Sequence, residues 1–266
     1  PADAIRKLAR DIAAAPRAAI YSRVGVTTSA HSTLSAWLVY LINILTGNLD
    51  REGGVMFTRP AFDIVALGAL SGDTGSFDRY RSRVHGYPEF GGEFPVTTLA
   101  DEMLTPGKGQ VKAFVSHAGN PVLSCPDGRK LDKALGQLDF MVSIDFYINE
   151  TTRHADIILP PTGQLEHAQF DPIFQAVAVR NVVKFTPPLV PKPEGSLHDW
   201  EILNGLTTRL NRLRARDRKT RLQITATDRF VRKLGDRGLV DLGLSLGPYG
   251  IGGKVLDDLR RDGLHS

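Results

Sequence analysis

The middle of the chain alternates continuous apolar runs with a segment of helical spacing. The runs cover residues 111–115, 140–144 and 157–159, and apolar residues at helical spacing occupy residues 131–138 between the first two runs. Strands that are buried on both faces read as unbroken apolar runs, and helical crossovers between them indicate parallel pairing. We therefore predict an α/β fold with a mainly parallel sheet in this region.

The N-terminal part of the chain predicts two helices on either side of a short strand. The first helix covers residues 2–15 and the strand covers residues 18–21. The second helix, residues 34–45, is apolar around most of its circumference, so we expect it to be buried. Gly47 is placed to end this helix in a left-handed turn.

Weaker patterns occupy the remaining segments. Glycines and prolines scattered among polar residues predict long loops over residues 58–108, with one helical turn at residues 97–104. Residues 175–185 have the composition of a strand, and the proline-rich residues 187–193 mark a boundary. A helix is expected to begin at Ser196.

Composition and charge exclude several classes of protein. A formal net charge of +4 over 266 residues is small, so we predict neither nucleic-acid binding nor attraction to an anionic membrane. No apolar run reaches the roughly 18 residues of a membrane span, and no signal-peptide pattern is visible, so we expect a cytoplasmic protein and leave the periplasm open. Because Cys125 is the sole cysteine, this chain alone supplies neither an iron–sulfur cluster nor a multi-cysteine zinc site.

Polar residues gather where the predicted parallel strands end, which is where such sheets bind ligands. Gly119 and Asn120 follow the first strand, Asp145 follows the second, and Glu166 and His167 come after the third. The glycine turn could bring backbone N–H groups close to a phosphate, although a plain tight turn is the alternative. Asp145 could accept two N–H bonds from a guanine edge or bind a ribose hydroxyl, or it could cap residues 149–154.

Other groups of residues give weaker indications. A metal site would need a third dependable ligand, which the spacing does not supply among His154, Asp156, Glu166, His167 and Asp171. Residues 196–199 form a start of the capping-box type, in which Asp199 would only bind a backbone amide. The basic run at residues 209–221 is typical of a solvated helix face, with phosphate contacts as the alternative. His117 beside Ser116 lacks the third member of a catalytic triad.

Taken together, these residues resemble the molybdopterin oxidoreductases of the dimethyl sulfoxide reductase class, which include formate dehydrogenases and nitrate reductases. The motifs that carry the resemblance occur in the family's order and spacing: Gly119-Asn120-Pro121, Ser124-Cys125-Pro126-Asp127, Asp145, Glu150-Thr151, Ala155-Asp156-Ile157-Ile158-Leu159-Pro160 and Glu166. Residues 45–54 and 247–250 look like two further blocks of the same family. The resemblance implies a three-layer αβα domain with a Rossmann-like sheet and part of a second α/β domain.

The resemblance also implies a cofactor, molybdopterin guanine dinucleotide carrying molybdenum or tungsten. In the family's pattern the guanine dinucleotide would contact Gly119, Asn120, Pro121, Ile144, Asp145, His167 and Asp199, and the pterin side would contact Val24, Gly25 and Thr28. Two residues depart from the pattern, because His167 replaces a frequent lysine and Thr28 replaces an occasional glutamine. No catalytic residue and no protein ligand to the metal is expected in this stretch, and any iron–sulfur cluster would lie N-terminal to it.

The resemblance divides the chain into three parts and implies partners. Residues 1–110 would complete the pterin-side domain, residues 111–215 would bind the dinucleotide, and residues 216–266, which show no closing element, would lead to a further domain. We expect this chain, which opens on Pro1, to be a processed product or an excised piece of a parent enzyme that reacts with a small redox substrate and possesses an electron-transfer subunit. The alternative is a cofactor-free structural subunit that keeps the fold as an assembly platform.

Overall fold

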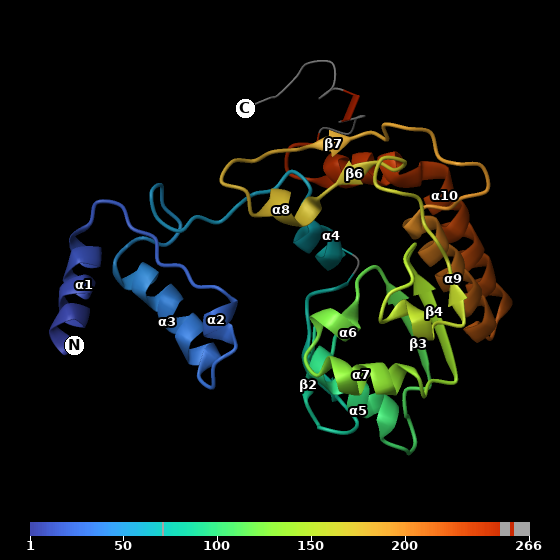
Figure 1. Cartoon of the computed structure of the whole chain (residues 1–266). Coiled ribbons are helices and arrows are strands. Elements are labelled where there is room, and N and C mark those ends of the chain that lie inside the picture. Colours follow the sequence, from blue (N-terminus) through green and yellow to red (C-terminus); the bar gives the residue numbers. More distant parts are fainter. Residues whose placement is uncertain (71, 251–255, 258–266) are drawn as a thin grey trace. The chain divides into compact units, whose positions relative to one another are not determined.

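The computed structural model describes residues 1–70, 72–250 and 256–257, which form two compact units (Figure 1). The first unit contains residues 1–60 and 176–181, and the second contains residues 61–175 and 182–266. Each unit has its own set of elements and is described separately below.

The first unit consists of three helices joined by extended chain: α1 (Ala2–Ala14), α2 (Val24–Thr27) and α3 (Ser32–Leu45). The helices predicted at residues 2–15 and 34–45 are confirmed, and Gly47 follows α3 with a positive φ of 67°. The strand predicted at residues 18–21 is wrong. Instead of pairing with a strand, the backbone of Ile20 forms hydrogen bonds of 3.0 and 2.9 Å with the side-chain amide of Asn43.

The prediction that the apolar helix is buried is also wrong. Asn43 is the buried residue of α3 in this structure, whereas Trp37 is 57% exposed and Leu34 is 53% exposed. A unit of this size buries only a limited share of its surface, so a helix that is apolar on most sides cannot be covered by it completely. The polar Asn43 is buried because its amide satisfies the backbone of Ile20.

A parallel three-stranded sheet forms the centre of the second unit. Its strands are β3 (Ala113–His117), β4 (Phe140–Ile144) and β5 (Ile157–Ile158), in the order β3-β4-β5. This confirms the α/β fold and the parallel sheet predicted from the apolar runs. In the register, Ser116 lies opposite Ser143, and their buried hydroxyl oxygens are 2.7 Å apart.

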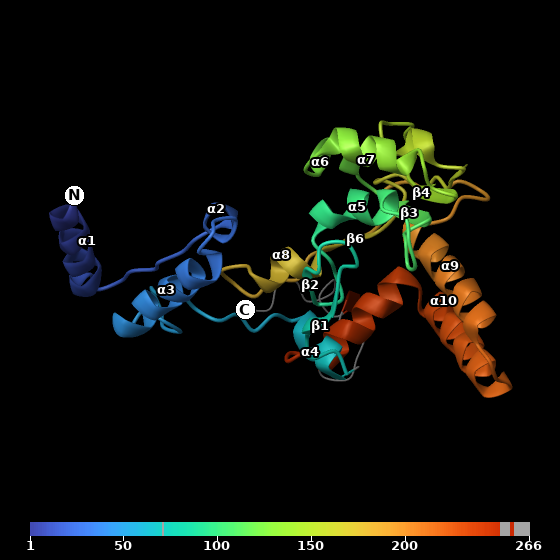
Figure 2. The ribbon, with the colours of Figure 1, turned by 90° about the horizontal axis from the view of Figure 1, so that it is seen from below.

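Helices lie on both sides of the central sheet, although Val115 of β3 is 51% exposed. Figure 2 shows α5 (Leu99–Leu104), α6 (Pro121–Ser124) and α7 (Gly128–Leu135) on one side of β3 and β4, and α9 (Asp199–Arg214) and α10 (Arg218–Leu246) on the other. The core between sheet and helices consists of the buried apolar residues Ala100, Met103, Leu131, Ala134, Leu135 and Met141. The layered arrangement places the loops after β3 and β4 at one edge of the sheet.

Regular structure occupies much of the segment predicted as loops. It contains α4 (Ile64–Leu70), β1 (Phe77–Arg81), β2 (Pro88–Phe90) and η1 (Val96–Thr98), followed by α5, so only the helical turn expected near residues 97–104 is confirmed. Strands β1 and β2 form an antiparallel pair. The buried carboxylate of Glu89 organises the pair, because it accepts hydrogen bonds from the Ser76 hydroxyl and from the backbone N–H groups of Arg79 and Gly92.

Short elements follow the central sheet: η2 (Thr152–His154), β6 (Gln169–Phe170), α8 (Pro172–Ala176) and β7 (Phe185–Thr186). The strand predicted at residues 175–185 is wrong, since only Phe185 of that segment lies in a strand, β7, which pairs with β6. Val179 in this segment is fully exposed, so its apolar side chains have no sheet face to cover.

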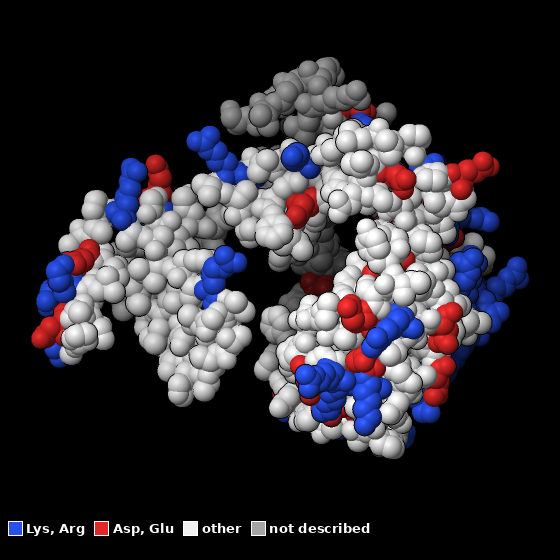
Figure 3. All heavy atoms as spheres, viewed as in Figure 1, with Lys and Arg blue, Asp and Glu red and all other residues white. Residues whose placement is uncertain are grey.

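Two helices complete the second unit. Helix α9 begins at Asp199 rather than Ser196, and its capping box is formed by His198 and Glu201. No closing element was predicted for residues 216–266, yet α10 runs for 29 residues with a kink at Gly235, whose φ is 63°. Figure 3 shows Lys and Arg side chains along the edge where α9 and α10 run, which fits a solvated face for the basic run.

Candidate functional site

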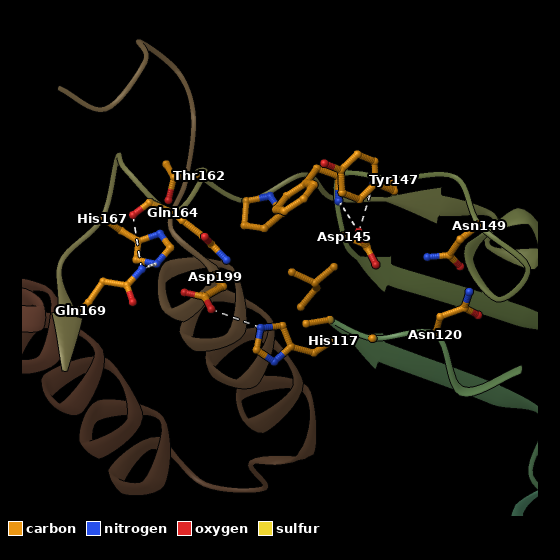
Figure 4. Close-up of a pocket in the computed structure, with 15 residues that line it drawn as sticks. His117, Asn120, Asp145, Tyr147, Asn149, Thr162, Gln164, His167, Gln169 and Asp199 are labelled. Carbon is orange, nitrogen blue, oxygen red and sulfur yellow. Dashed lines mark hydrogen bonds and ion pairs between the residues drawn. The ribbon is translucent and has the colours of Figure 1, made fainter. Parts of the chain in front are cut away.

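A pocket of about 560 Å³ lies where strands β3 and β4 end (Figure 4). Its walls come from the turn after β3, the turn after β4, the segment before β6 and the start of α9. The lining residues are His117, Ala118, Gly119, Asn120, Ile144, Asp145, Phe146, Tyr147, Asn149, Pro161, Thr162, Gln164, His167, Gln169 and Asp199. Of the predicted dinucleotide-binding residues, only Pro121 is outside this lining, and it begins α6 directly after Asn120.

The turn after β3 has two consecutive residues with positive φ. Ala118 has a φ of 47° and Gly119 a φ of 98°. The N–H of Ala118 is bonded to the carbonyl oxygen of Ile144 at 3.0 Å, which ties the turn to β4. Among the described residues, the N–H groups of Gly119 and Asn120 have no hydrogen-bond partner. They are therefore two donors on the wall of the pocket.

The side chain of Asn120 holds this turn in place. Its Nδ2 donates to Glu150 Oε2 at 2.6 Å, and its Oδ1 accepts from the Thr151 hydroxyl at 2.7 Å. Thr151 is fully buried, and its hydroxyl oxygen also accepts the N–H of Val122 at 3.1 Å. The hydrogen bond from Asn120 lowers the pKa of Glu150, so Glu150 stays ionised. The Glu150-Thr151 motif is thus a clamp on the glycine turn.

Asp145 extends from the end of β4 with one oxygen held and one free. Its Oδ1 accepts the N–H groups of Phe146 and Tyr147 at 2.7 and 3.0 Å, whereas Oδ2 has no partner within the part of the chain that the structure describes. The alternative that Asp145 caps residues 149–154 is wrong, because Asn149 Oδ1 accepts the N–H groups of Thr151 and Thr152 instead. Asp145 is therefore available to a ligand.

His117 and Asp199 meet on the pocket wall although they are 82 residues apart in sequence. The Nε2 of His117 lies 3.3 Å from Asp199 Oδ2, and Asp199 Oδ1 accepts the N–H of Trp200 at 2.8 Å. Figure 4 shows this pair between the Asp145 turn and His167, whose Nε2 lies 3.4 Å from the amide nitrogen of Gln169. Sequence reasoning treated His117 only as an incomplete triad, and no local signal links it to Asp199.

Three of the five residues considered as metal ligands are engaged elsewhere. His154 pairs with Asp132 at 2.6 Å, Asp156 accepts the N–H of Met141 at 2.7 Å, and Glu166 accepts the N–H of Gly163 at 2.7 Å. Within the described residues no three His, Cys, Asp or Glu side chains come together as a metal site. No described helix has the length and apolar character that a membrane span requires.

The three residues expected on the pterin side lie in the first unit. Val24 and Gly25 begin α2, and Thr28 follows it, with the Thr28 hydroxyl 3.4 Å from the carbonyl oxygen of Gly25. All three positions lie in one short helical turn, and a Cβ added to Gly25 would meet no atom within 4 Å. Their role in cofactor binding stays a prediction.

Comparison with known proteins agrees with the motifs in the pocket. The chain is 29% identical over 204 residues to the alpha subunit of a formate dehydrogenase of Methanocaldococcus jannaschii, covering 74% of this chain and 29% of that protein. It is 33% identical over 105 residues to the assimilatory nitrate reductase catalytic subunit of Bacillus subtilis, covering 39% and 14%. It is 27% identical over 183 residues to the molybdopterin-containing subunit of Salmonella typhimurium thiosulfate reductase, covering 62% and 24%.

The chain spans less than a third of the length of each of these relatives. A family model described as molybdopterin oxidoreductase matches residues 6–209, which include both turns of the pocket and the start of α9. This chain belongs to the molybdopterin oxidoreductase family, in the dimethyl sulfoxide reductase class.

Proposed function

We propose that this chain binds the guanosine diphosphate part of molybdopterin guanine dinucleotide, within a parent enzyme that carries out two-electron redox chemistry at molybdenum or tungsten. The observation that carries the proposal is the pocket at the ends of β3 and β4. It combines two backbone N–H groups and one carboxylate oxygen that have no hydrogen-bond partner among the residues that the structure describes.

The donors and acceptors of the pocket fit the two ends of a guanosine diphosphate group. Phosphate oxygens accept hydrogen bonds, and the N–H groups of Gly119 and Asn120 lack acceptors among the described residues. A guanine edge donates N1–H and N2–H, and the ionised carboxylate of Asp145 only accepts. A volume of about 560 Å³ lies within the range of small-molecule sites.

The bound cofactor would supply the metal at which two electrons pass to or from the substrate. This chain's residues would hold the dinucleotide: the turn at Gly119, Asn120 and Pro121 would receive the phosphates, and Ile144 with Asp145 would receive the base. His167 and Asp199 would border the same pocket, and Val24, Gly25 and Thr28 would contact the pterin side. We propose that this chain alone does not turn over substrate.

The partners proposed follow from the same assignment. They are the other domains of the parent enzyme, a small redox substrate and an electron-transfer subunit, with any iron–sulfur cluster outside these 266 residues because Cys125 is the sole cysteine. We keep the cytoplasm as the proposed compartment and keep the proposal that residues 1–110, 111–215 and 216–266 correspond to pterin-side, dinucleotide-binding and connecting regions. Residues 251–255 and 258–266 of the last region lie outside the described residues.

A second candidate is a cofactor-free subunit that uses the fold as an assembly platform. The exposed apolar side chains of α3, among them Trp37 at 57% exposure, favour this alternative, because large exposed apolar patches mark protein contacts. The Asp145 oxygen and the N–H groups that lack partners among the described residues favour cofactor binding instead, because a cofactor-free platform would leave these polar groups without partners.

Isothermal titration of the chain with guanosine and with adenosine tests the proposal. Guanosine should bind and adenosine should bind at least about tenfold more weakly, because adenine presents no pair of donors to Asp145. Asp145→Asn should abolish this preference, while the control Asp139→Asn, at the other end of β4, should keep it. In the parent enzyme, Asp145→Asn should lower molybdenum or tungsten content together with guanine content. Absence of guanosine binding, with a parent that purifies without metal and guanine, would support the platform.

A further inference from the structure

The pocket that we assign to an anionic dinucleotide contains no lysine or arginine among its lining residues. Its charged or titratable side chains are Asp145 and Tyr147 after β4, Asp199 on α9, and the two histidines His117 and His167. With both histidines neutral, the lining carries two negative charges, which oppose a pyrophosphate. Of the lining residues in the described part of the chain, only the two histidines can therefore bring a positive charge to this wall.

Hydrogen bonding fixes the state in which His117 can bind a phosphate. An ionised carboxylate only accepts hydrogen bonds, so the Nε2 of His117 must carry the hydrogen that faces Asp199 at 3.3 Å. In the neutral imidazole the other nitrogen, Nδ1, is then an acceptor, and it has no partner among the described residues. An acceptor repels a phosphate oxygen. Protonation turns Nδ1 into a donor and neutralises the charge of Asp199.

His167 has the opposite hydrogen-bond arrangement. The side-chain amide nitrogen of Gln169 lies 3.3 Å from the backbone carbonyl oxygen of Gln164. A carbonyl oxygen only accepts hydrogen bonds, so this nitrogen is the donor both to Gln164 and to His167. Facing that donor at 3.4 Å, the Nε2 of His167 accepts and its Nδ1 carries the hydrogen. His167 can thus donate to a ligand while it is neutral, and its contribution does not require protonation.

We infer that His117, positioned by Asp199, is a phosphate-binding residue of the pocket and makes the affinity for the pyrophosphate depend on pH. The inference rests on the proposed function and adds a residue that the family's motifs do not include. His117 is two residues before Gly119, so its ring and the unpaired N–H groups of the turn come from the same strand end. Its side chain is 40% exposed and that of Asp199 is 45% exposed, which leaves both accessible to a ligand.

The test is isothermal titration of the full chain with two probes at pH 6 and pH 8. Guanosine diphosphate mannose has both phosphates esterified, so its own charge is constant between these pH values, and guanosine has no phosphate at all. Because the protonated ring of His117 can donate from Nδ1 and the neutral ring cannot, affinity for the sugar nucleotide should fall about tenfold from pH 6 to pH 8. Affinity for guanosine should stay constant.

Four variants separate the roles of the histidines. His117→Gln should bind guanosine diphosphate mannose at pH 6 as weakly as the unaltered chain does at pH 8, and its affinity should no longer depend on pH. His117→Lys, with a permanent charge, should keep the high affinity at pH 8. His167→Gln should weaken binding and keep the tenfold pH dependence, and His31→Gln, an exposed histidine of the first unit, should change nothing.

The outcomes distinguish this inference from the proposed function. If the unaltered chain binds the sugar nucleotide equally well at both pH values and still binds guanosine, the role of His117 is overturned and the proposed function stands. A pH dependence that persists in His117→Gln would also overturn it. Absence of binding of both probes at both pH values would overturn the proposed function and the inference with it.

Discussion

Replacing Thr151 by valine should destabilise the second unit and loosen the glycine turn. Valine keeps the branched shape and replaces the hydroxyl by a methyl group, so packing is preserved and two hydrogen bonds are lost. The hydroxyl donates to Asn120 Oδ1 at 2.7 Å and accepts the N–H of Val122 at 3.1 Å, and Thr151 is fully buried. Each group left unpaired costs about 1–3 kcal/mol, and because both hydrogen bonds are only partly buried the lower part of this range applies, so the free energy of unfolding should fall by about 2–4 kcal/mol.

Urea denaturation followed by tryptophan fluorescence measures this loss. The chain contains two tryptophans, Trp37 in the first unit and Trp200 in the second, so the exposed Trp37 is replaced by phenylalanine in all samples and Trp200 alone reports. With an m value of about 2 kcal/mol/M, the midpoint of Thr151→Val should fall by about 1–2 M urea. The control Thr225→Val removes an exposed hydroxyl and should shift the midpoint by less than about 0.3 M. If the urea midpoint of Thr151→Val shifts as little as that of the control, the stabilising role of Thr151 on the glycine turn is refuted.

Three further predictions concern other parts of the fold. The hydrogen bonds of Glu89 lower its pKa to about 2. Its contribution to stability is therefore complete above the ordinary pKa of about 4.5 and is lost as pH falls toward 2. Glu89→Gln should reduce the loss of stability between these pH values, measured by acid unfolding followed by circular dichroism. A Cβ at Gly54 would lie 2.1 Å from the carbonyl oxygen of Asn48, so Gly54→Ala should lower the first unit's melting temperature, followed by Trp37 fluorescence, whereas an unchanged value would contradict the contact. Asn43→Leu leaves both backbone groups of Ile20 unpaired and should destabilise the first unit by about 2–4 kcal/mol, measured by urea denaturation with Trp200 replaced by phenylalanine so that Trp37 of the first unit reports.

The central sheet could be predicted from sequence because its signal is local. The apolar run at residues 140–144 coincides with β4, the run at residues 111–115 overlaps β3, which begins and ends two residues later, and parallel pairing followed from the crossover between them. The same reasoning gave the position of Gly119 and Asp145 at one edge, since the ends of adjacent parallel strands lie together. These two residues line one pocket, as expected from the strand ends.

The remaining features depend on contacts between distant residues. The pairing of His117 with Asp199 requires the start of α9 to lie beside the end of β3, and no local sequence pattern indicates that contact. The absence of a strand at residues 18–21 follows from the amide of Asn43, and the exposure of α3 follows from what the first unit can cover. Helix α10 was not predicted because Gly235 and its neighbouring glycines are typical of turns that end a helix, whereas this helix bends at Gly235 and continues.

The buried contact between Ser116 and Ser143 has a consequence for the geometry of the pocket. Two hydroxyl groups 2.7 Å apart satisfy each other in the interior of adjacent strands, and sliding one strand by a single position would separate them, in one direction placing Ser116 opposite Ile144 and Ser143 opposite Val115. The sliding would therefore cost the energy of two unsatisfied polar atoms. Because Gly119 comes three residues after Ser116 and Asp145 two residues after Ser143, this pair of serines fixes the position of the glycine turn relative to Asp145 across the pocket.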